Sequence, residues 1–190
     1  LLVTIGNAKD GRAIEWALDA MQTLPEHVHL ALLGRSYERF AGEIAGRGLE
    51  ERVHVVPPVR PSEVVPFVRS ADAALVLYYA LSVNIEYCLP NGFFQAIAAE
   101  LPLLYPELTE IRRLSETYGV GLPIVPQEAA SIEAGVLALL SQSCDEQQAL
   151  RERLAVASDA LSWEREELTL RDMLNHLTRA RSDSAPAPAN

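Results

Sequence analysis

The sequence predicts an α/β fold, a Rossmann-like parallel sheet with helices on both faces, followed by C-terminal helices. Short aliphatic runs alternate with amphipathic segments, which is the pattern of βαβ units. The runs are almost continuously apolar, as expected of strands that helices cover on both faces. With 190 residues, 49% of them hydrophobic, the chain can bury one substantial core and has no room for a second large domain.

Five strands and a short sixth are expected, because aliphatic residues form runs of strand length. The runs cover residues 1–5, 28–33, 52–56, 73–77 and 102–105, with the sixth near 122–125. The chain starts without Met and already inside the first run, so we expect a piece of a longer protein. One folded domain over residues 1–180 and a disordered tail over 181–190 are expected, because Ala and Pro alternate near the end.

Helical spacing marks the connections between these strands. Ile14, Ala17, Leu18 and Met21 fall on one stripe, and Pro25 ends that helix. Further helices are expected over residues 36–45, 63–69, 107–118, 131–140, 145–157 and 163–179, with another starting at residue 91. Ser36, Ser62 and Asn91 stand where a side-chain oxygen caps a helix start.

Charge and cysteine content exclude several functional classes. A net charge of -10 argues against nucleic acid, because phosphate neutralisation needs a basic surface. Cys88 and Cys144 are far apart with no ligand spacing around them, so neither a disulfide framework nor a metal site is expected. No apolar stretch approaches the roughly 20 residues of a transmembrane helix. A cytoplasmic protein without a cofactor is expected.

Ligands of open parallel sheets bind beyond the carboxyl ends of the strands, so the residues that follow each strand are the candidates. After the first strand, Gly6 and Asn7 open a small polar turn that leads through Lys9 and Arg12 into a helix. This turn can hold a diphosphate through helix-start N–H groups and the two cations, or it is an ordinary turn with solvated charges. Gly34, after the second strand, permits close backbone approach. The absence of Gly-x-Gly-x-x-Gly argues against a standard NAD site.

The richest candidate segment follows the fourth strand. Residues 78–84 form a loop, and Tyr87, Pro90 and Asn91 lead into a helix start whose N–H groups face any anion in the cleft. Gln95 lies four residues past Asn91 on the same helical face, so it can reach a ligand there. The proline-rich loop 57–63 can wall a base pocket, although its role as a helix entry needs no ligand.

The segment 89–102, LPNGFFQAIAAELP, resembles the donor-site segment of family 4 glycosyltransferases, LPNKFFEAIAAGLPV. The Gly6 turn, Leu33-Gly34, residues 55–59 and 70–72, and Ser162-Trp163-Glu164 also match in the family's order, so the resemblance spans residues 1 to about 170. It implies a GT-B architecture in which residues 1–180 bind a nucleotide-diphosphate sugar. A missing N-terminal half would bind the acceptor, a glycan or lipid-linked molecule.

By this resemblance the enzyme would be a retaining glycosyltransferase of polysaccharide biosynthesis, with no metal and inactive as a fragment. It would be either free in the cytoplasm or peripheral to the inner membrane face. Lys9 and Arg12 would be catalytic, stabilising the departing diphosphate. Substrate-binding residues would be Gly6, Asn7, Gly34, Tyr87, Pro90, Asn91, Gly92 and Gln95. The chain departs from the family pattern where Gly92 replaces Lys, Gln95 replaces Glu and Glu100 replaces Gly, and where Tyr87, beside Glu86, replaces the first acid.

These departures leave alternatives open. A degenerate, non-catalytic binding or assembly module would keep the fold without donor binding. An epimerase of the same architecture would need acid/base groups in the cleft, but His27, His29 and His54 lie at strand starts and His176 lies on the terminal helix. The nucleotide base, the sugar and the acceptor are not encoded in any motif of the sequence.

Overall fold

A computed structural model describes residues 1–183 and the side chains of residues 1–176. Six parallel strands form one sheet in the order β3-β2-β1-β4-β5-β6. Successive residues of β1 point to opposite faces, with Leu2 in one apolar cluster and Val3 and Ile5 in the other. The strands are β1 Leu2–Ile5, β2 Leu30–Leu33, β3 Val53–Val56, β4 Ala73–Leu75, β5 Leu103–Pro106 and β6 Gly121–Ile124.

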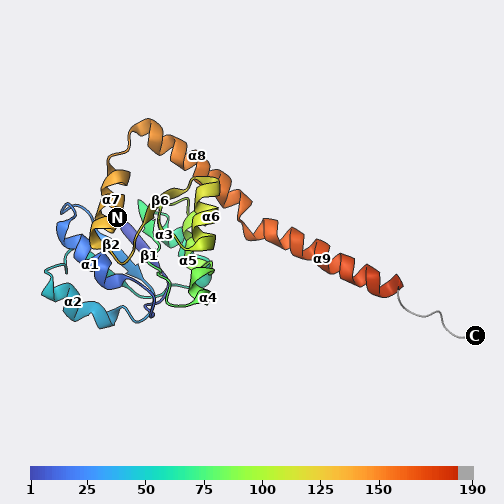
Figure 1. Cartoon of the computed structure of the whole chain (residues 1–190), viewed down its shortest axis with the longest axis horizontal. Helices are drawn as coiled ribbons and strands as arrows, with labels where there is room; N and C mark the ends of the chain where they lie inside the picture. Colours follow the sequence, from blue (N-terminus) through green and yellow to red (C-terminus); the bar gives the residue numbers. More distant parts are fainter. Residues whose placement is uncertain (184–190) are drawn as a thin grey trace, which may run out of the picture.

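Helices cover both faces of this sheet, which confirms the predicted fold class (Figure 1). Side chains of α1 (Ile14–Thr23), α2 (Ala41–Gly46) and α7 (Ala129–Leu140) pack on one face. Side chains of α3, α5, α6 and α8 pack on the other face. These helices are α3 Val64–Val68, α5 Asn91–Ala98, α6 Thr109–Tyr118 and α8 Cys144–Ala160, and the short helices η1 Glu38–Phe40, η2 Pro61–Glu63 and α4 Val83–Glu86 lie in the loops.

The three predicted helix caps were wrong. Ser36 has a positive φ of 67° and precedes η1 by two residues, so it cannot cap a helix. Arg60 and Glu63 occupy the N-cap positions around η2 and α3, which leaves Ser62 inside η2. Pro90, extended at φ -74° and ψ 147°, is the N-cap of α5, so Asn91 already lies in the first helical turn and its side chain makes no capping bond.

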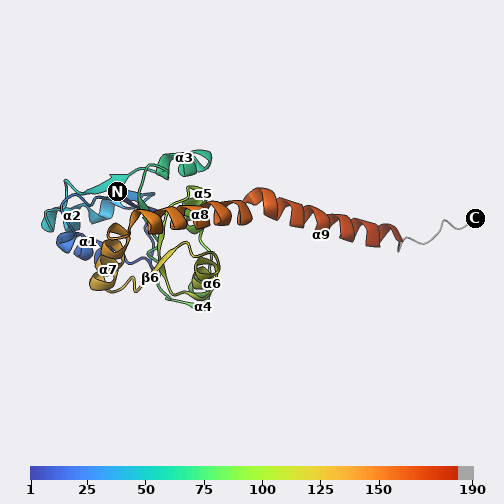
Figure 2. The same cartoon turned by 90° about the horizontal axis from the view of Figure 1, so that it is seen from above.

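The last helix, α9 (Trp163–Asp183), leaves the α/β body and extends away from it (Figure 2). It runs into the region predicted as a tail, of which residues 184–190 lie outside the described part of the chain. In that described part, no helix is both long enough and apolar enough to cross a bilayer.

Candidate functional site at the carboxyl edge of the sheet

The sheet has a topological switch point between β1 and β4. From β1 the chain moves outward first to β2 and β3, and it then returns to add β4, β5 and β6 on the other side. In open α/β sheets the ligand crevice lies outside the carboxyl ends of the strands at such a point. Gly6, at the end of β1, and Tyr78, beyond β4, therefore flank the position where a ligand is expected.

The turn after β1 is tied to the turn after β2 by backbone hydrogen bonds. The N–H groups of Gly6 and Ala8 donate to the carbonyls of Leu33 and Arg35, both at 2.9 Å. Asn7 accepts the Arg35 N–H at 3.0 Å through its side-chain oxygen. The N–H groups of Gly6 and Ala8 are thus used within the protein and are not free to bind a diphosphate.

Gly34 is required for this arrangement. Its φ is 151°, and a Cβ at this position would overlap the carbonyl of Gly6. The close backbone approach that Gly34 permits is therefore an approach to the β1 turn. The sequence analysis placed Gly34 among the ligand contacts, and the structure shows it holding two turns of the candidate site together.

The two cations of the first turn have different environments. Lys9 is exposed and is the only lysine of the chain. Arg12 is only 5% exposed, although it lies just ahead of α1 at the same edge of the sheet. The exposed side chain of Lys9 can contact a ligand directly, whereas the side chain of Arg12 lies buried below the Gly6 turn.

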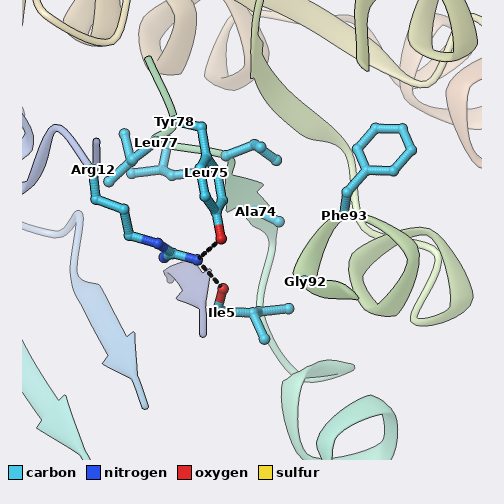
Figure 3. Close-up of a pocket in the computed structure, with 9 residues that line it drawn as sticks. Ile5, Arg12, Ala74, Leu75, Leu77, Tyr78, Gly92 and Phe93 are labelled. Atoms are coloured by element: carbon cyan, nitrogen blue, oxygen red, sulfur yellow. Dashed lines mark hydrogen bonds between the residues drawn. The ribbon is translucent and has the colours of Figure 1, made fainter. Parts of the chain in front are cut away.

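Four protein groups hold the guanidinium of Arg12, and Figure 3 shows two of them, the Ile5 carbonyl and the Tyr78 hydroxyl. Nη1 donates to Thr4 Oγ1 at 3.3 Å and to Tyr37 Oη at 3.1 Å. Nη2 donates to the carbonyl of Ile5 at 2.8 Å and to Tyr78 Oη at 2.9 Å. The ring of Tyr78 lies 4.5 Å from the guanidinium carbon, a cation–π contact. The sequence analysis did not identify Thr4, Tyr37 or Tyr78, whose only sequence signal is their position on or just beyond a strand.

The positive charge of Arg12 has no ionic partner. Within the described residues no carboxylate pairs with it, and its buried Nε has no hydrogen-bond partner. Burial raises the pKa of Tyr37 above its ordinary value of 10.0, although the charge of Arg12 lowers it. Tyr37 is therefore neutral at physiological pH and does not supply the missing negative charge. Buried charges are ordinarily paired, so an external anion is expected here.

The start of α5 meets the same carbonyl that Arg12 contacts. A Cβ on Gly92 would lie 2.6 Å from the Ile5 carbonyl oxygen, so only glycine allows α5 to begin this close to β1. The first N–H groups of an α-helix have no partner within the helix and carry its positive dipole end. A buried guanidinium and a helix start thus converge on the end of β1.

Two further predicted site residues, Tyr87 and Gln95, do not line the small cavity at this point. Tyr87 is 58% exposed, and Gln95 is half-buried one turn into α5. Glu86 Oε1 instead accepts bonds from the backbone N–H of Thr109 at 3.3 Å and from its hydroxyl at 2.7 Å, so its carboxylate serves the start of α6. Burial raises the pKa of Cys88, which keeps this thiol protonated and argues against a nucleophilic role.

The cavity at the switch point is small in this structure. It measures about 10 Å³ and is lined by Ile5, Arg12, Tyr78, Gly92 and Phe93 among others, which is enough for one water molecule. A groove of about 740 Å³ lies at the opposite edge, where Leu2, Leu101 and Val136 form part of its apolar lining. No group of three or more potential metal ligands occurs in the described part of the chain.

The strand order and the position of the candidate site define the class of this protein: a doubly wound, Rossmann-like α/β protein. The sequence also matches the family model of the group 1 glycosyl transferases over residues 1–142, and the chain belongs to this family. Its fold is that of a GT-B glycosyltransferase domain, similar to the C-terminal domain. No curated protein sequence matches the chain.

Solved structures of the same architecture share the fold at low sequence identity. Sucrose-phosphate synthase from Thermosynechococcus elongatus superposes with a TM-score of 0.79 at 19% identity, over 94% of this chain and 45% of that one. HepE of Anabaena in complex with UDP gives 0.77 at 14% identity, over 92% and 48%. The C-terminal domain of LpcC, a group 1 family protein from Francisella tularensis, gives 0.62 at 14% identity, over 83% and 82%. The chain spans about half the length of the first two proteins.

Proposed function

We propose that this chain is the donor-binding domain of a glycosyltransferase, and that it holds a nucleotide-diphosphate sugar at the β1/β4 switch point. One observation carries the proposal: the unneutralised guanidinium of Arg12 and the start of α5 meet at the end of β1. Both features favour negative charge, and a diphosphate supplies it. The complexes of HepE with UDP and with UDP-glucose support this choice of ligand.

The position of each site residue gives it a separate role in binding the nucleotide-diphosphate sugar. Lys9 would contact the diphosphate from solvent, and Arg12 would stabilise the charge that develops on the leaving diphosphate from below the Gly6 turn. The N–H groups at Asn91 and Gly92 would face the phosphates. Tyr87 and Gln95 would contact the sugar and ribose, where Gln95 can hydrogen-bond hydroxyl groups without carrying a charge.

The catalytic step would need the other half of the protein. An N-terminal domain would hold a glycan or lipid-linked acceptor, and transfer with retention of configuration would occur between the two halves without a metal. A cytoplasmic enzyme of polysaccharide biosynthesis, peripheral to the inner membrane face, is the setting we propose. The match to about half the length of sucrose-phosphate synthase and of HepE supports the presence of a second half that binds the acceptor.

A degenerate, non-catalytic module of the same fold is the second candidate function. The small cavity at the switch point and the absence of an acid at position 95 favour it. The two candidate functions differ in one measurable property, because only a donor domain must bind a nucleoside diphosphate.

Calorimetric titration of the chain with UDP, GDP and ADP tests the proposal. We expect saturable binding of one of them, weakened about threefold to thirtyfold by Lys9→Ala and by Gln95→Ala, as the loss of one polar ligand contact predicts. Arg69→Ala removes an equal charge at the opposite edge, and Gln22→Ala removes an exposed amide from α1, so both controls should bind normally. Failure of the unaltered chain to bind any of the three would favour the degenerate module.

A further inference from the structure

Tyr78 is held in place from both sides of its backbone. Arg12 and Tyr78 form an isolated antiparallel bridge, which joins the turn before α1 to the end of β4. On one side of the bridge the Ala13 N–H donates to Leu77 at 2.9 Å, and on the other the Tyr79 N–H donates to Gly11 at 3.0 Å. The position from which the Tyr78 ring enters the switch point is therefore fixed.

The hydroxyl of Tyr78 has one hydrogen-bonding function left. It accepts from Arg12 Nη2 at 2.9 Å, and an oxygen that accepts in this way directs its own proton elsewhere. Within the described residues no hydrogen bond from that proton is found, and Figure 3 shows the hydroxyl and the Ile5 carbonyl both accepting from Arg12 Nη2 at the end of β1. A phenol that accepts from a cation is also a stronger donor, because successive hydrogen bonds polarise one another.

We infer that Tyr78 is a ligand-binding residue whose hydroxyl donates to a diphosphate oxygen, and that Arg12 is the positioning residue that holds and polarises it. This inference rests on the proposed function and adds a residue to that site. The guanidinium of Arg12 supplies a positive charge. It polarises the Tyr78 hydroxyl, which then donates a stronger hydrogen bond to the ligand. It explains why a buried arginine is surrounded by neutral hydroxyls in place of carboxylates, since a carboxylate here would repel the phosphate.

Tyr37 provides a matched control within the same network. Its hydroxyl also accepts from Arg12, through Nη1 at 3.1 Å, but the residue is 0% exposed and packs in the core with α1 and α2. Removing either hydroxyl costs Arg12 one hydrogen bond of similar length. Only Tyr78 is near enough to the edge of the sheet to touch a ligand.

The test compares Tyr78→Phe with Tyr37→Phe in calorimetric titrations with the nucleoside diphosphate that the unaltered chain binds, and with the corresponding nucleoside. We expect Tyr78→Phe to raise the Kd for the diphosphate about tenfold, as loss of a hydrogen bond to a charged group predicts, with little change for the nucleoside. Tyr37→Phe should change either Kd by less than about twofold. Melting temperatures of the two variants check that both remain folded.

Each result decides a different claim. If the unaltered chain binds no nucleoside diphosphate, the proposed function fails. If it binds one and Tyr78→Phe binds equally well, Tyr78 does not contact the ligand. If Tyr37→Phe loses as much affinity as Tyr78→Phe, or if nucleoside binding falls in parallel, Tyr78 acts only by supporting Arg12 or the fold. Either of these last results would overturn the inference.

Discussion

Glu100 adopts a backbone conformation that glycine normally fills. Its φ is 58°, and it follows the last turn of α5 where the Glu100 N–H donates to Ile97 and the Leu101 N–H donates to Ala96. This pair of bonds is the Schellman motif, whose left-handed residue is usually glycine. The glutamate that departs from the family pattern thus sits at a strained helix end and far from the switch point, since β5 begins just after it.

Glu100→Gly should stabilise the protein by about 0.5–1 kcal/mol. The left-handed conformation costs a non-glycine residue roughly 1–2 kcal/mol, and part of this gain is offset by the greater entropy of glycine in the unfolded chain. Urea unfolding of the two proteins measures the difference. A lower unfolding free energy for Glu100→Gly would mean that the glutamate side chain makes contacts that outweigh the backbone strain.

Gly92 combines a structural and a functional role. Its missing side chain allows α5 to begin against the Ile5 carbonyl, so the lysine that the family pattern has here would not fit without movement of α5. At this position the residue that departs from the pattern is also the one that brings a helix start to the switch point. The departure is therefore tied to the local packing of this chain.

Gly92→Ala should lower the unfolding free energy by about 1–3 kcal/mol, because an added methyl group at 2.6 Å from a carbonyl oxygen forces backbone movement. Gly42→Ala is the matched control: Gly42 lies in α2 with open space around it, and alanine should stabilise that helix by up to about 1 kcal/mol. Opposite signs for the two substitutions are expected in urea unfolding. Equal effects would contradict the close packing described for Gly92.

At the scale of single residues, the sequence predicted where the candidate site lies better than it predicted the side-chain hydrogen bonds within that site. The cluster of polar residues after β1 and β4 follows from strand order, which hydrophobic runs reveal. The burial of Arg12 was not predictable, because its acceptors Thr4, Tyr37 and Tyr78 are far apart in the sequence and meet only in the folded chain. Nothing in the sequence distinguishes an exposed from a buried arginine in a polar turn.

At the scale of elements, α8 has the best-defined start in the fold. Ser143 Oγ accepts the Glu146 N–H at 3.3 Å, and Glu146 Oε2 accepts the Ser143 N–H at 2.8 Å. Reciprocal bonds of this kind form a capping box. The bond from the Ser143 backbone is the main cause that lowers the pKa of Glu146 below 4.5.

Glu146→Gln should lower the melting temperature by about 2–4 °C at neutral pH, because the charged cap at the positive end of α8 is lost. Because the pKa of Glu146 is lowered on folding, its stabilising contribution is complete above pH 4.5 and is lost as the pH falls through the folded value. The difference from wild type should therefore be constant between pH 5 and 8 and shrink below about pH 4.

Glu133→Gln, which removes a carboxylate from the middle of α7, is the control for this series. Thermal unfolding followed by circular dichroism at each pH measures both variants. A difference between wild type and Glu146→Gln that does not change with pH would show that the cap does not depend on the charge of Glu146.

Apolar periodicity predicted where the helices and strands lie along the chain, but it did not predict the residues at which they begin and end. The strands and most helices lie where apolar spacing placed them, because burial on both faces of a parallel sheet leaves a strong pattern. The wrong predictions of helix starts were caused by the backbone geometry of the loops. Pro90 took the capping position ahead of Asn91, and the positive φ of Ser36 separated it from η1. The short helix α4, which Ser82 caps, begins inside the segment 78–84 that was predicted to be a loop.

The whole molecule presents its two edges very differently. The carboxyl edge carries the glycine turns, the start of α5 and Lys9, around a cavity of about 10 Å³, large enough for one water molecule. The opposite edge carries the larger groove, which Arg69 and Arg151 border beside Leu1. Strand order places the ligand at the first edge and cavity size alone would place it at the second. The charge arrangement agrees with strand order, because the unneutralised guanidinium of Arg12 lies at the first edge.

The most direct test of this claim uses the single lysine of the chain. Lys9 lies exposed at the carboxyl edge, so an amine-reactive reagent reports on that edge, and an arginine-reactive reagent reports on Arg69 and Arg151 beside the opposite groove. Labelling is followed by mass spectrometry with and without a saturating concentration of the nucleoside diphosphate that binds in calorimetry. The proposed site predicts that the ligand slows labelling of Lys9 severalfold and leaves the labelling of Arg69 and Arg151 unchanged. Slower labelling of Arg69 and Arg151 alone, with Lys9 unaffected, would contradict a donor site at the β1/β4 switch point.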